Sequence, residues 1–212
     1  MKKTILACLS LFLTIGLINV NAQNDISFGL KGEMNLSNFI LKDLNNLESN
    51  MKVGPNLGAY MRIDLHENFA IQPEVLFFFR QSEMGIKTNT SFLPTISTDD
   101  TFKQWGMQIP VYALGKLPVG NGNFYLGVGP FVGVGFDARL KDADINLYDE
   151  IVGKIPMQRW DVGIATMLGY EFKNGIQLNA SYQYGFINQL DALKDVSNMN
   201  MQALNIGIGY TF

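Results

Sequence analysis

The sequence has one cysteine, Cys8, and one histidine, His66. A single cysteine excludes an intramolecular disulfide framework and a thiolate metal site. A single histidine, placed beside Glu67 and Asn68 in a turn-like stretch, cannot build a histidine-rich metal site. It also leaves the serines of the polar segments without a second group for a nucleophile–histidine pair. We therefore expect no cofactor, no metal and no enzymatic activity.

An excess of positive charge is also missing, because 16 basic residues stand against 19 acidic ones, a net charge of −3. This balance disfavours nucleic acid as a partner. Beyond residue 22 no apolar run reaches the ~18 residues that a transmembrane helix needs. The sequence nevertheless is 47% hydrophobic and contains 21 glycines, so its apolar residues must be organised in another way.

The first 22 residues have the layout of a secretory signal peptide. Lys2 and Lys3 precede an apolar run over residues 5–20, and Val20-Asn21-Ala22 resembles a small-residue cleavage site. Cys8 allows a lipoprotein alternative, which is disfavoured because most of the apolar run follows it. We expect residues 1–22 to be removed and residues 23–212 to form one domain. Loss of the two lysines leaves 14 basic and 19 acidic residues, a net charge of −5.

A period of two in hydrophobicity runs through most of the remaining chain and predicts strands. Eight are expected, over residues 26–39, 52–65, 69–83, 102–117, 123–137, 157–172, 176–188 and 200–212. The connections alternate in length. Those at 66–68, 118–122 and 173–175 are short, whereas those at 40–51, 84–101, 138–156 and 189–199 are long and polar. This asymmetry is typical of transmembrane barrels of the bacterial outer membrane, which have short periplasmic turns and longer external loops.

The two faces of the strands differ in kind. Along the fifth strand Phe124, Leu126 and Val128 alternate with Gly127 and Gly129. Glycine weakens a water-facing strand, whereas small residues fit the crowded interior of an eight-stranded barrel. The same parity carries five positive and five negative side chains, which we interpret as an ion-pair network in the lumen: Lys31, Glu33, Arg62, Asp64, Glu74, Arg80, Lys116, Arg159, Asp161 and Glu171.

The opposite face carries bulky side chains such as Phe77, Trp105 and Trp160, several near strand ends, where interfacial aromatic residues belong. The predicted fold is an all-β, eight-stranded, antiparallel up-and-down transmembrane β-barrel. A soluble barrel around an apolar ligand is the alternative, and the charged, glycine-rich parity disfavours it.

The chain ends on LNIGIGYTF (204–212), which predicts the strand that closes the barrel against the first strand. Closure leaves no unpaired edge in lipid. Tyr210 and Phe212 share its apolar face. Phe212 is expected at the periplasmic interface, and these two aromatic residues are interpreted as the C-terminal signal for barrel closure.

Four stretches resemble an outer-membrane β-barrel family typical of Bacteroidetes, the PorT or "porin family" type. They are FGLKGEMNLSNF (28–39), VGPNLGAYMRIDL (53–65), FAIQPEVLFF (69–78) and QIPVYALGK (108–116). The resemblance implies a small eight-stranded barrel in the outer membrane. It also implies that the outer-membrane assembly machinery reads the terminal aromatic residue. One member type is tied to protein secretion.

Two motifs are rejected as binding sites. The glycines over residues 127–135 lack the spacing and the following helix of a dinucleotide site. Asp142, Asp144 and Asn146 begin like a calcium loop, but Leu147 occupies its sixth position and Gly153 its twelfth. A weak divalent-cation contact beside lipopolysaccharide phosphates stays open, as does a narrow or gated passage. Open pores need ~16 strands, whereas side chains fill an eight-stranded interior.

The function expected from these features is that of a monomeric, integral outer-membrane protein with a polar, filled lumen. Its role is structural or adhesive, through four external loops that contact lipopolysaccharide or other envelope proteins. The alternative is a membrane-embedded subunit of a transport or protein-secretion system.

Overall fold

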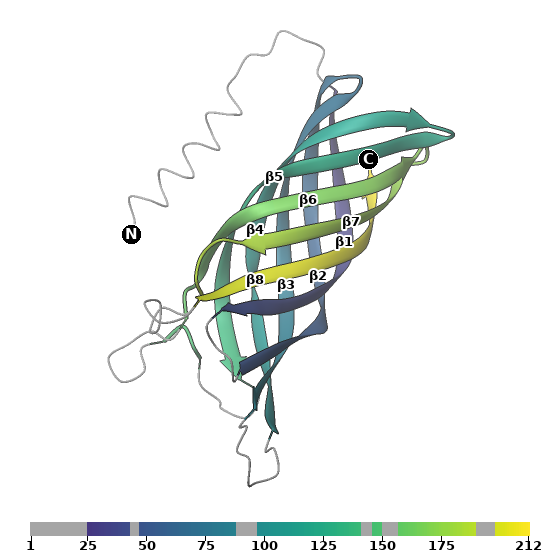
Figure 1. Ribbon diagram of the computed structural model, residues 1–212. Helices are drawn as coiled ribbons and strands as arrows, with labels where there is room; N and C mark the ends of the chain where they lie inside the picture. Colours follow the sequence, from purple (N-terminus) through teal and green to yellow (C-terminus); the bar gives the residue numbers. More distant parts are fainter. Residues whose placement is uncertain (1–24, 43–46, 88–96, 141–145, 150–156, 190–197) are drawn as a thin grey trace, which may run out of the picture.

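The computed structural model describes residues 25–42, 47–87, 97–140, 146–149, 157–189 and 198–212. The predicted signal peptide, 1–22, lies outside them. The described chain forms a closed antiparallel barrel in which each strand pairs with the next (Figure 1). The strands are β1 (Ile26–Lys42), β2 (Leu47–His66), β3 (Phe69–Lys87), β4 (Ser97–Val119), β5 (Gly122–Leu140), β6 (Trp160–Phe172), β7 (Ile176–Gly185) and β8 (Asn198–Thr211). The predicted eight-stranded fold is confirmed.

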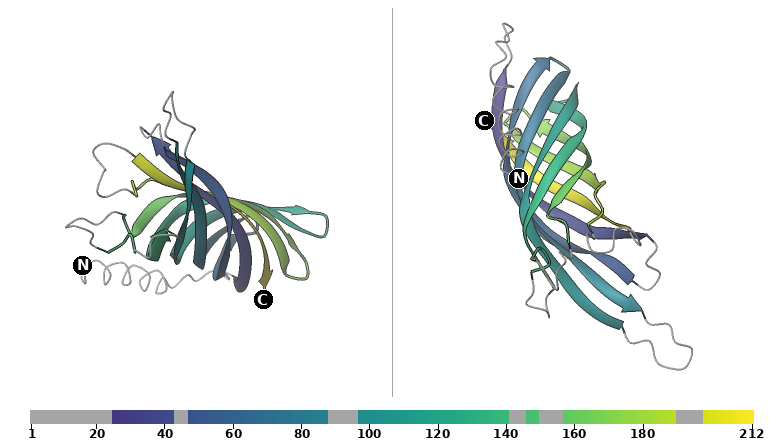
Figure 2. Two further views of the ribbon diagram at one scale, coloured as in Figure 1. Left: turned by 90° about the horizontal axis from the view of Figure 1, so that it is seen from below. Right: turned by 90° about the vertical axis from the view of Figure 1, so that its left-hand side faces the viewer.

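The last strand closes the barrel. β8 runs antiparallel to β1 in a continuous register from Gly29 opposite Thr211 to Lys42 opposite Asn198. The Phe212 amide extends this seam by donating to the Phe28 carbonyl at 2.8 Å. Figure 2 shows the strands curving around a common axis, with the C-terminus at the rim that bears the tight turns. No backbone edge is therefore left along the seam.

Side chains alternate between the outside and the lumen as the sequence predicts. In β6 exposed and buried positions alternate from Trp160 to Gly169. The outward positions are large and apolar, and Phe77, Leu126 and Ile208 are 55%, 60% and 57% exposed. Such an exposed apolar belt is suited to lipid rather than to water. The inward positions hold glycines, tyrosines, amides and charges.

The wall is uneven in height at the end with the long connections. β1–β5 reach further into the predicted loops than the hydrophobic pattern indicates, and Lys87 pairs with Ser97 at the tip of β3 and β4. By contrast, β6 begins at Trp160 and β7 ends at Gly185, both short of the predicted spans. Figure 1 shows β3 and β4 extending past β6 and β7 at this end. The backbones stay paired there although the strands no longer have an apolar face. Hydrophobic periodicity in the sequence therefore cannot mark where these strands end.

A β-bulge interrupts the pairing of β2 with β3. Residues 52–55 stand opposite residues 79–81, so the register shifts there, and Pro55 has no N–H to donate. Asn35 of β1 compensates from the lumen, because its amide donates to the Phe79 carbonyl at 3.0 Å. Ser37 likewise donates to the Gln81 carbonyl at 3.1 Å. The lumen side chains thus satisfy carbonyls that the strand ladder leaves unpaired.

Gly54 sits inside this bulge, where a Cβ would overlap the Phe79 carbonyl oxygen. We expect Gly54→Ala to destabilise the barrel by about 1–3 kcal/mol, because the overlapped atom is backbone and cannot swing away. Gly115→Ala is the matched control, since the nearest heavy atom to its Cβ would be 3.9 Å away. Urea unfolding in lipid vesicles, followed by tryptophan fluorescence, measures both. Equal losses would refute the close approach at Gly54.

Candidate functional site

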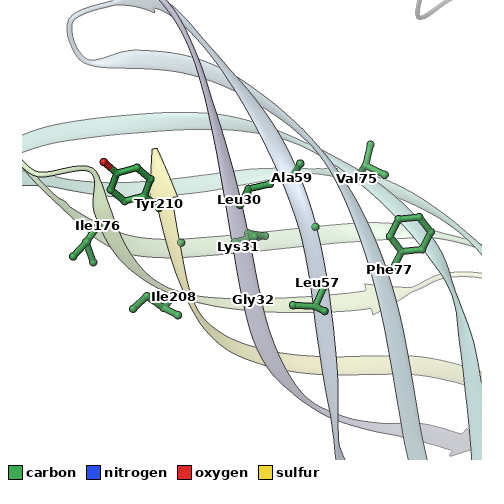
Figure 3. A pocket seen from close by; sticks show the side chains of 12 residues that line it. Leu30, Lys31, Gly32, Leu57, Ala59, Val75, Phe77, Ile176, Ile208 and Tyr210 are labelled. Atoms are coloured by element: carbon green, nitrogen blue, oxygen red, sulfur yellow. The ribbon is translucent and has the colours of Figure 1, made fainter. Parts of the chain in front are cut away.

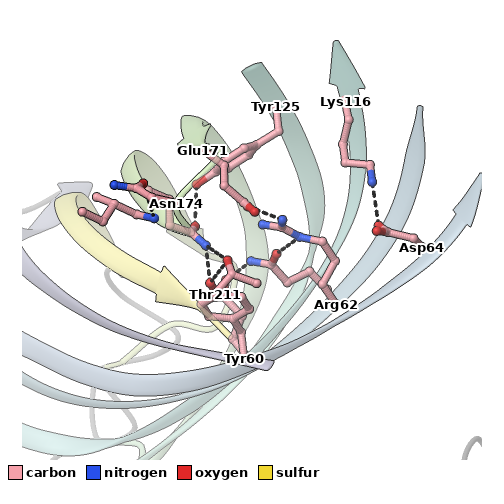
Figure 4. Close-up of polar contacts among 12 residues, drawn as sticks. Tyr60, Arg62, Asp64, Lys116, Tyr125, Glu171, Asn174 and Thr211 are labelled. Carbon is pink, nitrogen blue, oxygen red and sulfur yellow. Dashed lines mark hydrogen bonds and ion pairs between the residues drawn. The ribbon is translucent and has the colours of Figure 1, made fainter. Parts of the chain in front are cut away.

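The lumen begins with a charged layer at the rim of tight turns (Figure 4). Arg62 pairs with Glu171 and donates from Nε to Gln72 at 2.8 Å. Its guanidinium lies 5.5 Å from the centre of the Tyr125 ring. Nearer the rim, Lys116 pairs with Asp64 at 2.7 Å. Each cation in this layer is therefore matched by one carboxylate.

The middle of the lumen holds a fully enclosed charge cluster. The Lys31 ammonium lies 2.8 Å from a Glu33 oxygen and 2.6 Å from a Glu74 oxygen, and all three side chains are at most 2% exposed. Asn56 and Gln72 donate amide hydrogen bonds to Glu33 and Glu74 respectively, at 3.2 and 2.8 Å. The network fills the interior, as eight strands allow.

The third layer contains Arg80 and Asp161. Arg80 donates from Nη2 to the amide oxygens of Gln108 and Gln183, and its guanidinium lies 3.9 Å from the centre of the Phe78 ring. Asp161 is 7% exposed. Within the described ranges no cation lies in ion-pair contact with it, so Arg80 is held chiefly by amides and an aromatic ring.

Of the ten side chains expected in the lumen network, Arg159 is the one whose observed position differs most from the prediction. Its side chain is 44% exposed, pairs with Asp149 at 3.3 Å and lies 5.1 Å from the centre of the Tyr148 ring, so it takes no part in the charge network of the lumen. The reason is that β6 starts at Trp160, so the alternation that would turn Arg159 inward has not yet begun. Glu74 pairs with Lys31 in the middle of the lumen.

Tyr148 closes the end of the lumen with the long connections. The described part of the β5–β6 connection folds inward, and Tyr148 is 2% exposed. Its hydroxyl accepts a hydrogen bond from Gln104, and its ring packs so close to Gly135 that a Cβ there would overlap the hydroxyl. Burial raises the pKa of Tyr148, so the neutral hydroxyl persists.

Tyr148 belongs to a buried apolar cluster that the sequence did not predict. Its other members include Phe39, Phe102, Met157, Met199 and Met201. Two enclosed spaces adjoin it, around Arg80 and Gln104, each with a volume of about 10 Å³. A space of this size holds about one water molecule. In the part of the chain that the structure describes, the outer lumen is therefore packed rather than open.

Little in the sequence indicates that the segment around Tyr148 closes the lumen. Leu147 and Tyr148 are a bulky pair within a polar segment, and Asn146 forms a turn there by accepting from the Tyr148 amide at 3.1 Å. Arg159 fixes the segment from the other side, since it donates to the Tyr148 carbonyl at 3.2 Å. Only the fold brings these distant residues together.

Aromatic pairs mark both ends of the apolar belt. Trp105 and Phe136 lie edge to face at 5.1 Å near the long connections. Tyr210 and Phe212 do the same at 5.3 Å near the tight turns, where Phe212 is 72% exposed. Such rings are suited to the two membrane–water interfaces.

The outer surface also contains an open groove over β1, β2, β3, β7 and β8 (Figure 3). The small residues Gly32 and Ala59 form part of its lining, and Leu57, Phe77 and Ile208 contribute apolar side chains. Lys31 contributes only its backbone, because its ammonium turns into the lumen. The groove belongs to the lipid-facing belt.

Among the described residues, no helix is long and apolar enough to cross a membrane. No three His, Cys, Asp or Glu side chains among them gather as a metal site would require. The calcium-like motif at 142–146 lies largely outside the described residues.

The comparisons with known proteins agree with this geometry. Residues 21–191 match the family described as outer membrane protein beta-barrel domain. The chain belongs to this family. The protein is thus a β-barrel of the bacterial outer membrane, as the exposed apolar belt and its aromatic borders require. No curated protein sequence matches the chain at a significant level.

Solved structures that are similar to this chain come from several bacteria. The outer membrane protein OprG of Pseudomonas aeruginosa has 16% identity and a TM-score of 0.51, over 88% of this chain and 95% of that one. Neisserial surface protein A has 13% identity and a TM-score of 0.49, over 89% and 99%. The attachment invasion locus protein Ail of Yersinia pestis has 17% identity and a TM-score of 0.40, over 88% and 99%. At 16% identity the likeness to OprG concerns the fold alone.

Proposed function

We propose that this outer-membrane barrel is a non-conducting, non-catalytic anchor that presents its external loops for structural or adhesive contacts. The observation that carries the proposal is the packed lumen. A layer of matched ion pairs lies at one end of it and Tyr148 at the other. In outer-membrane barrels the long connections face outward. The interacting surface is then the tall end of the wall together with the four long connections.

The proposed partners are lipopolysaccharide and other envelope proteins, and the barrel acts as a monomer. The assembly machinery of the outer membrane reads its last aromatic residue. The relationship to the Bacteroidetes PorT type rests on the four resembling stretches. Those stretches are also compatible with a second candidate role, that of a membrane-embedded subunit of a transport or secretion system.

Conductance separates the two roles. We expect the purified, refolded protein to give no single-channel steps in planar lipid bilayers and no swelling of sugar-filled liposomes, because side chains occupy the lumen. Steady conductance steps from the wild-type protein would contradict the anchor role and favour transport.

Site-specific crosslinking in cells tests the interaction role. A photo-reactive residue at Asn50, exposed on β2 near the long connections, is expected to capture an envelope protein or lipopolysaccharide. The same residue at Leu126, within the lipid-facing belt and 60% exposed, is the matched control and should capture membrane lipid only. Capture of the same proteins from both positions, or none from Asn50, would oppose the proposal.

A further inference from the structure

The register of the β1–β8 seam needs an explanation of its own. β1 and β8 are the only paired strands of the described barrel that are not consecutive in the chain. In a hairpin the turn sets which residues face each other, and the seam lacks this restraint. The apolar face does not supply it, because Leu204, Ile206 and Ile208 present a similar surface after a shift of two residues. The backbone ladder also repeats every two residues, so other groups must select the observed register.

Asn205 is the first side chain that distinguishes one register from the next. It lies in the lumen, 1% exposed, and its amide oxygen accepts a hydrogen bond from Asn56 of β2 at 3.1 Å. Its amide nitrogen donates to the Ser181 hydroxyl of β7 at 2.9 Å. Asn35 stands opposite Asn205 on β1 and donates to Asn56 at 2.7 Å. A shift of two residues replaces Asn205 with an alanine or a glycine, and neither side chain can accept the hydrogen bond.

Thr211 distinguishes the registers a second time, at the rim of tight turns (Figure 4). The Tyr60 side chain of β2 reaches it across Gly29 of β1, where a Cβ would overlap the tyrosine ring. The hydroxyls of Tyr60 and Thr211 lie 2.8 Å apart. Gln177 of β7 donates to the same threonine hydroxyl at 3.0 Å. A shift of two residues in either direction moves this hydroxyl about 7 Å away from Tyr60.

Gly207 adds a restraint in one direction only. It lies opposite Glu33, and a Cβ at this place would overlap the Glu33 side chain and the Gly32 carbonyl oxygen. A shift that brings Asn205 opposite Glu33 is therefore blocked by backbone atoms. The opposite shift brings Gly209 to this place, where there is no Cβ to overlap. Polar contacts must oppose that second shift.

We propose that Asn205 and Thr211 set the register in which β8 closes the barrel. Asn56 and Tyr60, both on β2, recognise them across β1 from inside the lumen. A buried donor or acceptor that loses its partner is costly, so hydrogen bonding selects the register that the apolar face leaves open. This inference concerns the closure of the barrel and is independent of what the external loops bind.

Paired cysteines in the purified, refolded protein report the register directly. The chain has no other cysteine once Cys8→Ser is introduced. Met34→Cys is combined with Ile206→Cys, which is opposite it in the observed register. Two further pairs, with Ile208→Cys or with Leu204→Cys, report a shift of two residues in either direction. An oxidant joins only cysteines that stand opposite each other, since diagonal ones are too far apart. Non-reducing gels measure the yield, because the linked chain migrates differently.

Without further changes we expect the pair with Ile206→Cys to dominate. Asn205→Ala combined with Thr211→Ala should raise the yield of the Ile208→Cys pair, relative to the Ile206→Cys pair, roughly tenfold. The Leu204→Cys pair should stay low, because it reports the shift that the Gly32 carbonyl blocks. An unchanged ratio in the folded double variant would overturn the proposal.

Tyr60→Phe tests the same proposal through the loss of a single hydroxyl, and we expect it to raise the ratio about threefold. Tyr148→Phe is the matched control, because it removes a buried tyrosine hydroxyl that bonds Gln104 of β4, away from the seam. It should leave the ratio unchanged. Heat-dependent gel migration shows that each variant is folded. No effect of Tyr60→Phe, or an equal effect of Tyr148→Phe, would contradict recognition across β1.

Discussion

Replacing Lys31 with methionine is expected to destabilise the barrel by about 3–5 kcal/mol, the cost of leaving buried charge without its partner. The variant keeps an unbranched side chain one atom shorter but removes the ammonium between Glu33 and Glu74. Both carboxylates are at most 1% exposed, so water cannot replace it. Urea unfolding in lipid vesicles measures the loss as a lower midpoint.

Lys116→Met is the control for this experiment. Lys116 also pairs with a carboxylate, but its side chain and that of Asp64 are 13% and 29% exposed at the rim. Solvent there screens the remaining charge, so we expect a loss below about 1 kcal/mol. Replacing Glu33 and Glu74 with glutamine in the Lys31→Met background should restore much of the stability, because no charge is then left unpaired. Equal losses at Lys31 and Lys116 would contradict the enclosure of the central cluster.

Deletion of Phe212 is expected to reduce assembled barrel in the outer membrane several-fold while export continues. Its contacts are modest: one backbone hydrogen bond to Phe28 and an edge-to-face contact with Tyr210. Together these account for about 1–3 kcal/mol in a purified barrel. The proposed recognition by the assembly machinery would add an effect that appears only in cells. Cell fractionation and heat-dependent gel migration measure the assembled fraction.

Phe186→Ala provides the comparison for the Phe212 deletion. Phe186 is also an exposed aromatic residue, 60% accessible, and it packs on Tyr184 at 5.8 Å near the opposite rim. Its loss should cost similar stability in vitro but leave assembly in cells close to wild type. If Phe186→Ala impairs assembly as much as the deletion does, the special role of the C-terminal aromatic residue is wrong.

The barrel itself was predictable because the membrane imposes a simple rule. Outward positions such as Phe77 and Ile208 must be apolar, and inward ones such as Gly129 and Lys31 are free to be small or charged. This contrast persists over every strand and therefore reveals their number, order and facing. It ends where the lipid ends, which is why the sequence underestimates the lengths of β3 and β4.

The details of the lumen depended on information that periodicity does not contain. Parity places Lys31 and Glu74 inside, but the partner of each is set by strand stagger and by the bulge at Pro55. Arg159 was assigned to the lumen by extending an alternation past the true start of β6. Tyr148 lies in a polar connection, and its inward packing requires the glycine at position 135 of a different element.

The seam between β1 and β8 has a consequence for biogenesis. The two strands that seal the wall, β1 and β8, lie far apart in the chain, so the wall cannot close before β8 is available to pair with β1. The complete domain must therefore cross the periplasm before it inserts, with its future lipid-facing surface uncovered. A chain in that condition aggregates readily.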